Sequence, residues 1–388
     1  MKDIPEFNLN RWSQRRQHEI KIPLHGSAVR PLSLAELQIL APDASLSSPV
    51  DHQLVLAYSK AQGSLKLRER IAEIHSGSAV KLTADNVIIT PGSILANYLA
   101  LAILAGPGDH VICQYPTFTQ LWAIPKFQGV EVSLWKLKPG DNGWEASLDE
   151  LKGLVRENTK AIIIKCVITL HPGATHPSSF ILMMINNTTA TQTTPPAPSS
   201  PPPPSSPSCP SPRSTTPHHA LLRRGLCPAL PRPSPSPSST TPVPVATPTP
   251  PSIVSLPYPH TLATGSVSKA IGLPGIRIGW VISPSTAVLN RIMTARDYTT
   301  ISVSLLDEGV AAFALAPGVL PALLARNLAI CGRSIALLQA WVDGHSKGTG
   351  SGRVAWVPPQ GAGTAFVRVF EKGGRGGRWM RRCLRRGW

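Results

Sequence analysis

The chain has 388 residues, of which 41 are proline, and a formal net charge of +17. It is long enough for two or three domains with their own cores, has no run of the roughly 18 apolar residues that a membrane span needs, and begins without the apolar segment of a secretory signal. Eleven basic residues lie in 181–250 and 372–388, two segments without acidic residues, so the charge does not form a periodic basic face and does not predict nucleic-acid binding.

Residues 50–177 have the pattern of an α/β domain. An amphipathic helix is predicted within 58–76, where apolar residues recur at near-helical spacing. Short β-branched runs at 87–93, 110–118 and 161–168 predict buried strands, and an apolar helix directly follows the first of them. Strands that alternate with helices predict a mostly parallel sheet flanked by helices.

Residues 178–250 differ from the rest of the chain in composition. Twenty of the 41 prolines lie between positions 181 and 250, among Ser and Thr and without Asp, Glu, Tyr or Trp. Such a segment cannot bury enough apolar surface to offset chain entropy, so no packed structure is predicted for it. Two interpretations are open: a natural Pro/Ser linker, or sequence foreign to the protein, such as a retained intron or a frameshifted reading.

The globular pattern returns at Ser252. The predicted elements are, in chain order, a strand at 275–282, helices at 286–298, 303–315 and 320–345, and two strands joined by a turn within 354–370. After Glu371 the chain becomes a run rich in Arg, Gly and Trp that resembles nothing upstream. This half of the sequence therefore predicts the remainder of the α/β domain, followed by a smaller domain and a basic tail.

The segment TGSVSKAIGLPGIRIGW, residues 264–280, carries the strongest chemical signal. Lys269 can form a Schiff base with an aldehyde once its amine is unprotonated. Arg277 can bind a phosphate through two parallel hydrogen bonds, and Ser266 and Ser268 add short hydroxyl donors. This combination suits a phosphorylated aldehyde cofactor, and the alternative is an ordinary surface Lys and Arg beside a glycine turn.

This segment resembles the cofactor-lysine signature of the class I and II aminotransferases, which are fold type I enzymes that depend on pyridoxal 5'-phosphate (PLP). The similarity extends over residues 50–165 and 252–370. It implies a fold type I α/β domain with a mostly parallel sheet flanked by helices, plus a smaller α+β domain. It also implies that Lys269 holds PLP, and that an amino acid and a 2-oxo acid are the substrates.

The resemblance implies further contacts with the cofactor. Gly92, Ser93 and Ile94 stand where a helix follows a strand, and the free N–H groups and dipole of such a helix bind phosphate; in the family this turn holds the PLP phosphate. Phe118 matches the aromatic residue that stacks on the pyridine ring, with a place in the core as the alternative. Tyr58 matches a tyrosine that reaches the phosphate of the partner subunit in a homodimer, with a structural role as the alternative.

Three features of the family are missing at their expected places. Leu170 stands where an Asn should bond the ring oxygen of PLP. An Asp should pair with the pyridinium nitrogen and keep the ring a good electron acceptor, but no acidic residue lies between Glu157 and Asp297. The carboxylate-binding Arg falls after Glu371, where the resemblance ends. Because the Pro/Ser segment replaces family residues instead of interrupting them, the interpretation as foreign sequence is favoured.

Two classes of function follow from these observations. The first is an aminotransferase that works through a Lys269 Schiff base and is impaired by the missing Asp and Arg. The second is a PLP-binding protein without turnover, and the fold also hosts lyases and cyclopropane-forming synthases. The expected partners are an amino acid, a 2-oxo acid and a second copy of the chain, with no nucleic acid and no membrane.

Six scattered cysteines without a C-x-x-C pair argue against a zinc site or a disulfide framework, so the protein is expected to be cytoplasmic and to hold no metal.

The sequence predicts six segments: an N-terminal arm with part of the small domain (1–49), the first part of the large PLP-binding domain (50–177), the Pro/Ser-rich insertion (178–250), the second part of the large domain (251–315), a truncated small C-terminal domain (316–371) and the basic tail (372–388).

Overall fold

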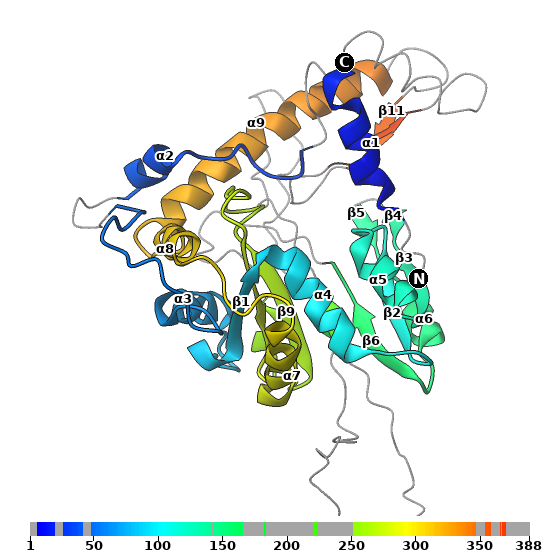
Figure 1. Cartoon of the computed structure of the whole chain (residues 1–388). Coiled ribbons are helices and arrows are strands. Elements are labelled where there is room, and N and C mark those ends of the chain that lie inside the picture. The colour runs from blue at the N-terminus through cyan, green and yellow to red at the C-terminus, as the bar shows by residue number, and fades with distance from the viewer. Residues whose placement is uncertain are drawn as a thin grey trace, which may run out of the picture.

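A computed structural model describes residues 6–19, 26–41, 48–140, 143–165, 182–183, 220–222, 251–346, 354–357, 365 and 367–369. Two groups of strands form the centre of this part of the chain, and helices pack around them (Figure 1). The predicted Pro/Ser-rich insertion lies outside the described residues except for positions 182–183 and 220–222, and the basic tail lies entirely outside them.

The first group of strands is a four-stranded sheet in the order β1-β10-β9-β8. Its strands are β1 (Val87–Pro91), β10 (Ile278–Ile282), β9 (Thr261–Ser266) and β8 (Ala220–Leu222). β10 runs antiparallel to both β1 and β9, and β8 pairs in parallel with β9. Every residue of β9 and β10 is buried, so this sheet is covered on both faces.

The second group has the strand order β3-β2-β6-β7. Its strands are β3 (Glu131–Lys136), β2 (His110–Tyr115), β6 (Thr159–Ile163) and β7 (Leu182–Met183). β2 is parallel to β3 and to β6, whereas β7 is antiparallel to β6. Because β6 lies beside β8, the two groups are neighbours. The predicted α/β fold with parallel strands and flanking helices is confirmed.

Six helices cover the strands, and α4 is the central one. Their bounds are α3 (Leu65–His75), α4 (Gly92–Leu104), α5 (Gln120–Phe127), α6 (Leu148–Leu154), α7 (Thr286–Asp297) and α8 (Leu305–Ala314). α4 packs against β9, β10, α5 and α7 (Figure 1). Its first turn is therefore fixed relative to both strands that flank the predicted cofactor lysine.

The long helix α9 (Leu320–Ser346) leads from this domain toward two short strands. Those strands, β11 (Val354–Trp356) and β12 (Val367–Val369), pair antiparallel, as the strand-turn-strand prediction requires, and α9 contacts β11. By length and composition α9 is apolar enough to cross a membrane, but core helices of soluble proteins pass the same test, so this is weak evidence.

The remaining elements are short. They are α1 (Asn8–Arg16), α2 (Leu34–Ile39), β4 (Lys138–Gly140), β5 (Gly143–Glu145) and the 3-10 turns η1 (Gln17–Glu19), η2 (Ala84–Asn86) and η3 (Ile253–Ser255). α2 begins with a capping box, in which Ser33 Oγ accepts from the Glu36 backbone and the Glu36 carboxylate accepts from the Ser33 backbone.

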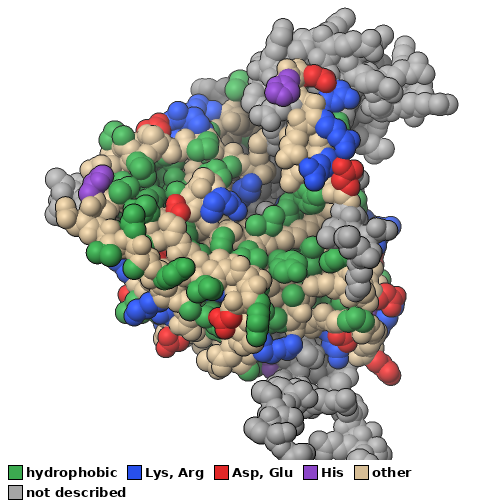
Figure 2. Space-filling model, viewed as in Figure 1, with side chains coloured by type: hydrophobic (Ala, Val, Ile, Leu, Met, Phe, Trp, Pro, Cys, Tyr) green, Lys and Arg blue, Asp and Glu red, His purple; other side chains and the backbone are tan. Residues whose placement is uncertain are grey.

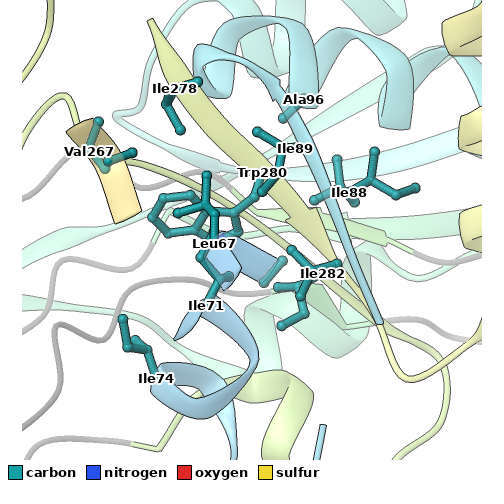
Figure 3. Packing of buried hydrophobic residues seen from close by; sticks show 14 of the residues in the cluster. Leu67, Ile71, Ile74, Ile88, Ile89, Ala96, Val267, Ile278, Trp280 and Ile282 are labelled. Atoms are coloured by element: carbon teal, nitrogen blue, oxygen red, sulfur yellow. The ribbon is translucent and has the colours of Figure 1, made fainter. Parts of the chain in front are cut away.

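Trp280 on β10 lies in the middle of the main hydrophobic core. Leu67 and Ile71 of α3 belong to the same cluster and approach it in Figure 3. The indole fills the space above Gly265 on the neighbouring strand, where a Cβ would overlap the ring, and its Nε1 donates to His75 Nε2 at 3.2 Å. A side chain at position 265 would therefore displace Trp280 and open the core.

The helix predicted within 58–76 begins only at Leu65. Gly63 has a φ of 100°, a left-handed conformation that cannot belong to a helix. Leu67, Ile71 and Ile74 are buried as the pattern predicts, whereas Leu65 is half exposed because it lies on the first turn.

Glu308 on α8 joins that helix to the loop before α3. Its carboxylate accepts from Ser59 Oγ at 2.5 Å and from the Ser64 backbone N–H at 2.8 Å. Burial raises the pKa of Glu308, although these hydrogen bonds and the charges of Arg296 and Arg68 act in the opposite direction.

Candidate active site

The connection between β9 and β10 carries most of the predicted site. β9 ends at Ser266 and β10 begins at Ile278. The loop that contains Lys269 therefore leaves and re-enters the sheet at the same edge, the one formed by these strand ends. On the other side of β10, Pro91 at the end of β1 pairs with Ile278. α4 begins at the next residue, Gly92. The strand pairing therefore brings the lysine loop and the first turn of α4 to one place.

Arg277 and Gly92 are in close contact across this edge. A Cβ on Gly92 would overlap Arg277 Nη2, and Gly92 itself has a φ of 77°. Arg277 has a φ of 50°, and its Nη1 donates to Pro274 O at 2.9 Å. Gly279 on β10 packs against the Gly92–Ser93 peptide so closely that a Cβ there would overlap it. Only glycines allow the guanidinium to lie this near the start of α4.

The start of α4 has the properties of a phosphate site. The helix has 13 residues, and no side chain caps its N-terminus. Its first N–H groups and the positive end of its dipole are therefore available to an anion, and the Arg277 guanidinium adds a positive charge beside them. Ser93 is buried on the first turn, while the Ile94 side chain is half exposed. The residues that the sequence predicts for the PLP phosphate are present together, and their donor set fits that group.

Lys269 is half-buried, and its nitrogen has a defined neighbour. Nζ donates to Ser27 Oγ at 2.6 Å. The two predicted serines, Ser266 and Ser268, are both buried beside it in the chain, and the Ser268 N–H donates to Ser266 Oγ at 3.4 Å. Ser27 was not predicted as a site residue.

Phe118 and Tyr58 have different surroundings. Phe118 follows β2, just after a cis peptide bond between Tyr115 and Pro116, and is partly buried against the main core. Its ring lies 5.3 Å from that of Phe7, measured between centroids, at an angle of 57°. Tyr58 lies in the loop before α3 with its side chain 86% exposed. Within one subunit the structure therefore gives Tyr58 no place in the site.

A buried polar network behind the first turn of α4 was missed by the sequence analysis. Thr264 Oγ1 on β9 donates to Asn97 Oδ1 at 2.7 Å, and Asn97 Nδ2 donates to Gln120 Oε1 at 3.0 Å. Gln120 Nε2 in turn donates to Ile94 O at 2.7 Å. The chain of bonds connects the strand that leads to Lys269 with the turn predicted to hold phosphate. No local motif marks such a network, because its members come from β9, α4 and α5.

Three expected positions lie outside the described residues. They are Leu170, the segment that should contain the pyridinium-binding Asp, and the region after Glu371 that should contain the carboxylate-binding Arg. Among the residues that the structure does describe, no three His, Cys, Asp or Glu side chains gather as metal ligands would. The site defined by this geometry is thus an anion cradle beside a loop lysine at the edge of a buried sheet.

The structure thus brings a loop that carries a lysine, a helix N-terminus and an adjacent arginine to one edge of the sheet. The family model for aminotransferase class I and II matches residues 40–172 and 250–324, which is more than half of the chain. The chain therefore belongs to the class I and II aminotransferase family, and its cofactor is PLP.

Individual relatives agree with this assignment. Capreomycidine synthase from Streptomyces vinaceus is 26% identical over 315 residues, 80% of this chain and 68% of that protein. Mouse tyrosine aminotransferase is 33% identical over 107 residues, which span 28% of this chain and 23% of that protein. The crystal structure of a PLP-dependent aminotransferase from Streptococcus suis superposes with a TM-score of 0.65 at 25% identity, covering 95% of this chain and 83% of that one.

Proposed function

We propose that this protein transfers an amino group between an amino acid and a 2-oxo acid, with Lys269 as the residue that holds PLP. One observation carries the proposal: the uncapped first turn of α4 and the Arg277 guanidinium form a cationic cradle at the sheet edge from which the Lys269 loop extends. An aldehyde cofactor with a phosphate needs these two functions, an anion site and an amine, close together.

Each residue of this cluster has a role that its position supports. Arg277 and the N–H groups of residues 92–94 hold the phosphate, and Ser266 and Ser268 add hydroxyl donors. When bound, PLP supplies an electron sink for the carbanion formed at the substrate Cα. Lys269 would hold the cofactor covalently, and its amine, when free, would take the proton from the substrate Cα and return it to the product.

Phe118 and Tyr58 have roles in the proposal that depend on assembly. Phe118 supplies an aromatic face for the cofactor ring, and its partner Phe7 holds that face in place. Tyr58 reaches the phosphate of a second subunit, which accounts for a large aromatic side chain left almost fully in solvent. The active site is then shared across a homodimer.

An exposed apolar surface supports the homodimer. Val55, Leu56 and Tyr58 in the loop before α3, and Tyr298 and Ile301 before α8, are each at least 58% exposed. The Ser59–Glu308 hydrogen bond keeps the first loop beside α8. In Figure 2 hydrophobic side chains gather on the part of this face that the loop before α3 occupies in Figure 1. Monomeric proteins seldom leave such a surface uncovered.

We propose neither a nucleic acid nor a membrane as a partner. We also propose that the protein works in the cytosol. On the face shown in Figure 2, the described Lys and Arg side chains are interspersed with Asp and Glu instead of forming one basic patch. Cys113, which lies within the described residues, is a buried free thiol, and this suits a reducing compartment.

A second candidate is a PLP-dependent reaction other than transamination, or cofactor binding without turnover. The similarity to capreomycidine synthase extends over more of the chain than the similarity to tyrosine aminotransferase. In addition, the sequence has no acidic residue between Glu157 and Asp297 to keep the pyridine ring protonated. A ring without that partner is a weaker electron sink.

The visible absorption spectrum of the purified protein during titration with PLP tests the proposal. We expect a shifted band in the wild type and in the exposed-lysine control Lys81→Ala, and none in Lys269→Ala. Adding amino acids then separates the candidates: conversion to a 2-oxo acid supports transamination, another product supports a synthase, and a band that persists without product supports a binding protein. A folded wild type without any shifted band would reject the cofactor assignment.

A further inference from the structure

Ser27 contacts the nitrogen on which the proposed chemistry depends. The Lys269 Nζ to Ser27 Oγ distance is 2.6 Å, although the two residues are 242 positions apart in the chain. Lys269 comes from the loop between β9 and β10, whereas Ser27 comes from the N-terminal segment 26–32. The contact therefore exists only if this segment is held over the lysine loop.

The N-terminal segment is held there through its backbone and one buried side chain. Arg326 Nη1 on α9 donates to Arg30 O at 3.2 Å. Val29, two residues after Ser27, is buried. These anchors, two and three residues after Ser27, keep the segment that carries the exposed Ser27 next to the lysine loop.

The same part of α9 also fixes the lysine loop. Asn327, the neighbour of Arg326, is fully buried, and its Nδ2 donates to Ala270 O at 2.6 Å. Gly272 in that loop lies so near the N-terminal segment that a Cβ on it would be 3.7 Å from Arg30 O. Residues 326–327 thus hold both partners of the Ser27–Lys269 contact.

We propose that Ser27 is the positioning residue of Lys269: its hydroxyl holds the lysine nitrogen over the site whenever that nitrogen is not bonded to the cofactor. The proposal rests on the proposed function, which gives Lys269 the proton transfer at the substrate Cα. A hydroxyl suits this task because it accepts from an ammonium and donates to a free amine. The contact restricts the positions that the nitrogen can take at the end of a flexible four-carbon side chain.

The contact itself is tested in the cofactor-free protein. Trace labelling with acetic anhydride, quantified for each lysine by mass spectrometry, reports the reactivity of Lys269 relative to the exposed Lys60 and Lys66. In Ser27→Ala we expect labelling of Lys269 to rise about fivefold, because the nitrogen loses a hydrogen-bond partner and becomes more accessible to the reagent. Ser27→Thr keeps the hydroxyl and should stay within about twofold of the wild type.

A matched control is available in the same segment. Ser33→Ala removes a serine hydroxyl that caps α2 and does not contact Lys269. This variant should lose some stability, as cap removal does, but should leave the labelling of Lys269 unchanged. An equal effect of Ser27→Ala and Ser33→Ala would mean that a general loosening of the N-terminal segment causes it, and would overturn the positioning role.

The second readout uses the PLP-loaded protein. Ser27→Ala should slow the change of the visible band after addition of an amino acid about tenfold, leave the concentration of amino acid at half-maximal rate within about twofold, and be rescued by threonine. Failure of the wild type to form the band would reject the proposed function. Unchanged acetylation of Lys269 in Ser27→Ala would reject the assignment of Ser27, whether or not PLP binds.

Discussion

Arg277 has a φ of 50°, an unusual value for a residue with a side chain. Backbone conformations of this kind cost on the order of 1–3 kcal/mol and persist where the surrounding structure enforces them, often at ligand sites. Here the conformation places the guanidinium against Gly92, where a Cβ would overlap it. At the scale of single residues, the proposed phosphate cradle is thus a matched pair: a strained arginine and a glycine that makes room for it.

The variant Gly92→Ala tests this pair. Alanine would bring its Cβ into Arg277 Nη2 and would have to adopt a φ of 77°. We expect the dissociation constant for PLP to rise at least about tenfold, which corresponds to about 1.4 kcal/mol. Gly106→Ala is the control, because a Cβ there has no atom within 4 Å. Equal PLP affinity of both variants, measured by absorbance titration, would contradict the cradle.

Glu308 predicts a pH dependence of stability. Burial raises its pKa above the ordinary value of 4.5. The folded state therefore holds the proton more tightly than the unfolded state, so the stabilising contribution is full below pH 4.5 and is lost as the pH rises through the raised pKa. Measured by urea unfolding, the wild type should lose stability relative to Glu308→Gln as the pH rises from below 4.5 to neutral. A constant difference between the two proteins across that range would disprove the assignment.

At the scale of elements, α4 is fixed by polar contacts as well as by packing. The bonds from Thr264 through Asn97 and Gln120 to Ile94 O connect β9, α5 and the first turn of α4. Thr264, Asn97 and Gln120 are all buried, and an unpaired polar group at a buried position is costly. The network makes the orientation of the phosphate-binding turn depend on the strand that leads to Lys269.

Thr264→Val removes one link of this network at nearly constant volume. It leaves Asn97 Oδ1 without its donor, so we expect a loss of about 1–3 kcal/mol in the free energy of unfolding and weaker PLP binding. Thr294→Val, at an exposed position of α7, should change the unfolding free energy by less than about 0.5 kcal/mol. Chemical denaturation of the two variants decides the point, and similar values for both would show that the network is unimportant.

At the scale of the whole molecule, the exposed apolar residues in the loops before α3 and α8 form the contact surface of the proposed homodimer. A glutamate in place of Ile301 would put a charge into the proposed dimer contact, and we expect the dissociation constant of the dimer to rise about 100-fold. Leu337→Glu is the control, at an exposed leucine of α9 outside this contact. Sedimentation velocity across a concentration series measures both, and a wild type that stays monomeric at high concentration would reject the homodimer.

How far the sequence predicts this molecule depends on how local each feature is. Lys269, Ser266, Ser268 and Arg277 lie within one short segment, so their pattern alone indicates a PLP site. The Ser27 contact depends on a segment 242 positions away, and no pattern within either segment encodes it.

The antiparallel direction of β10 could not be predicted from the sequence either. Its residues are all buried, and a strand covered on both faces has the same apolar pattern whether it runs parallel or antiparallel to its neighbours. The late start of α3 follows from the positive φ of Gly63. A glycine permits this conformation, but its presence in the sequence does not predict it.

The most direct test of the central claim is to identify the residue that carries PLP. The wild type is incubated with PLP, reduced with borohydride, digested and mapped by mass spectrometry. We predict one major adduct, on Lys269, and clearly less of it in Gly92→Ala at PLP concentrations near the dissociation constant of the wild type. Adducts spread over several exposed lysines, with Lys269 no more modified than the others, would contradict the assignment of this chain's cofactor site.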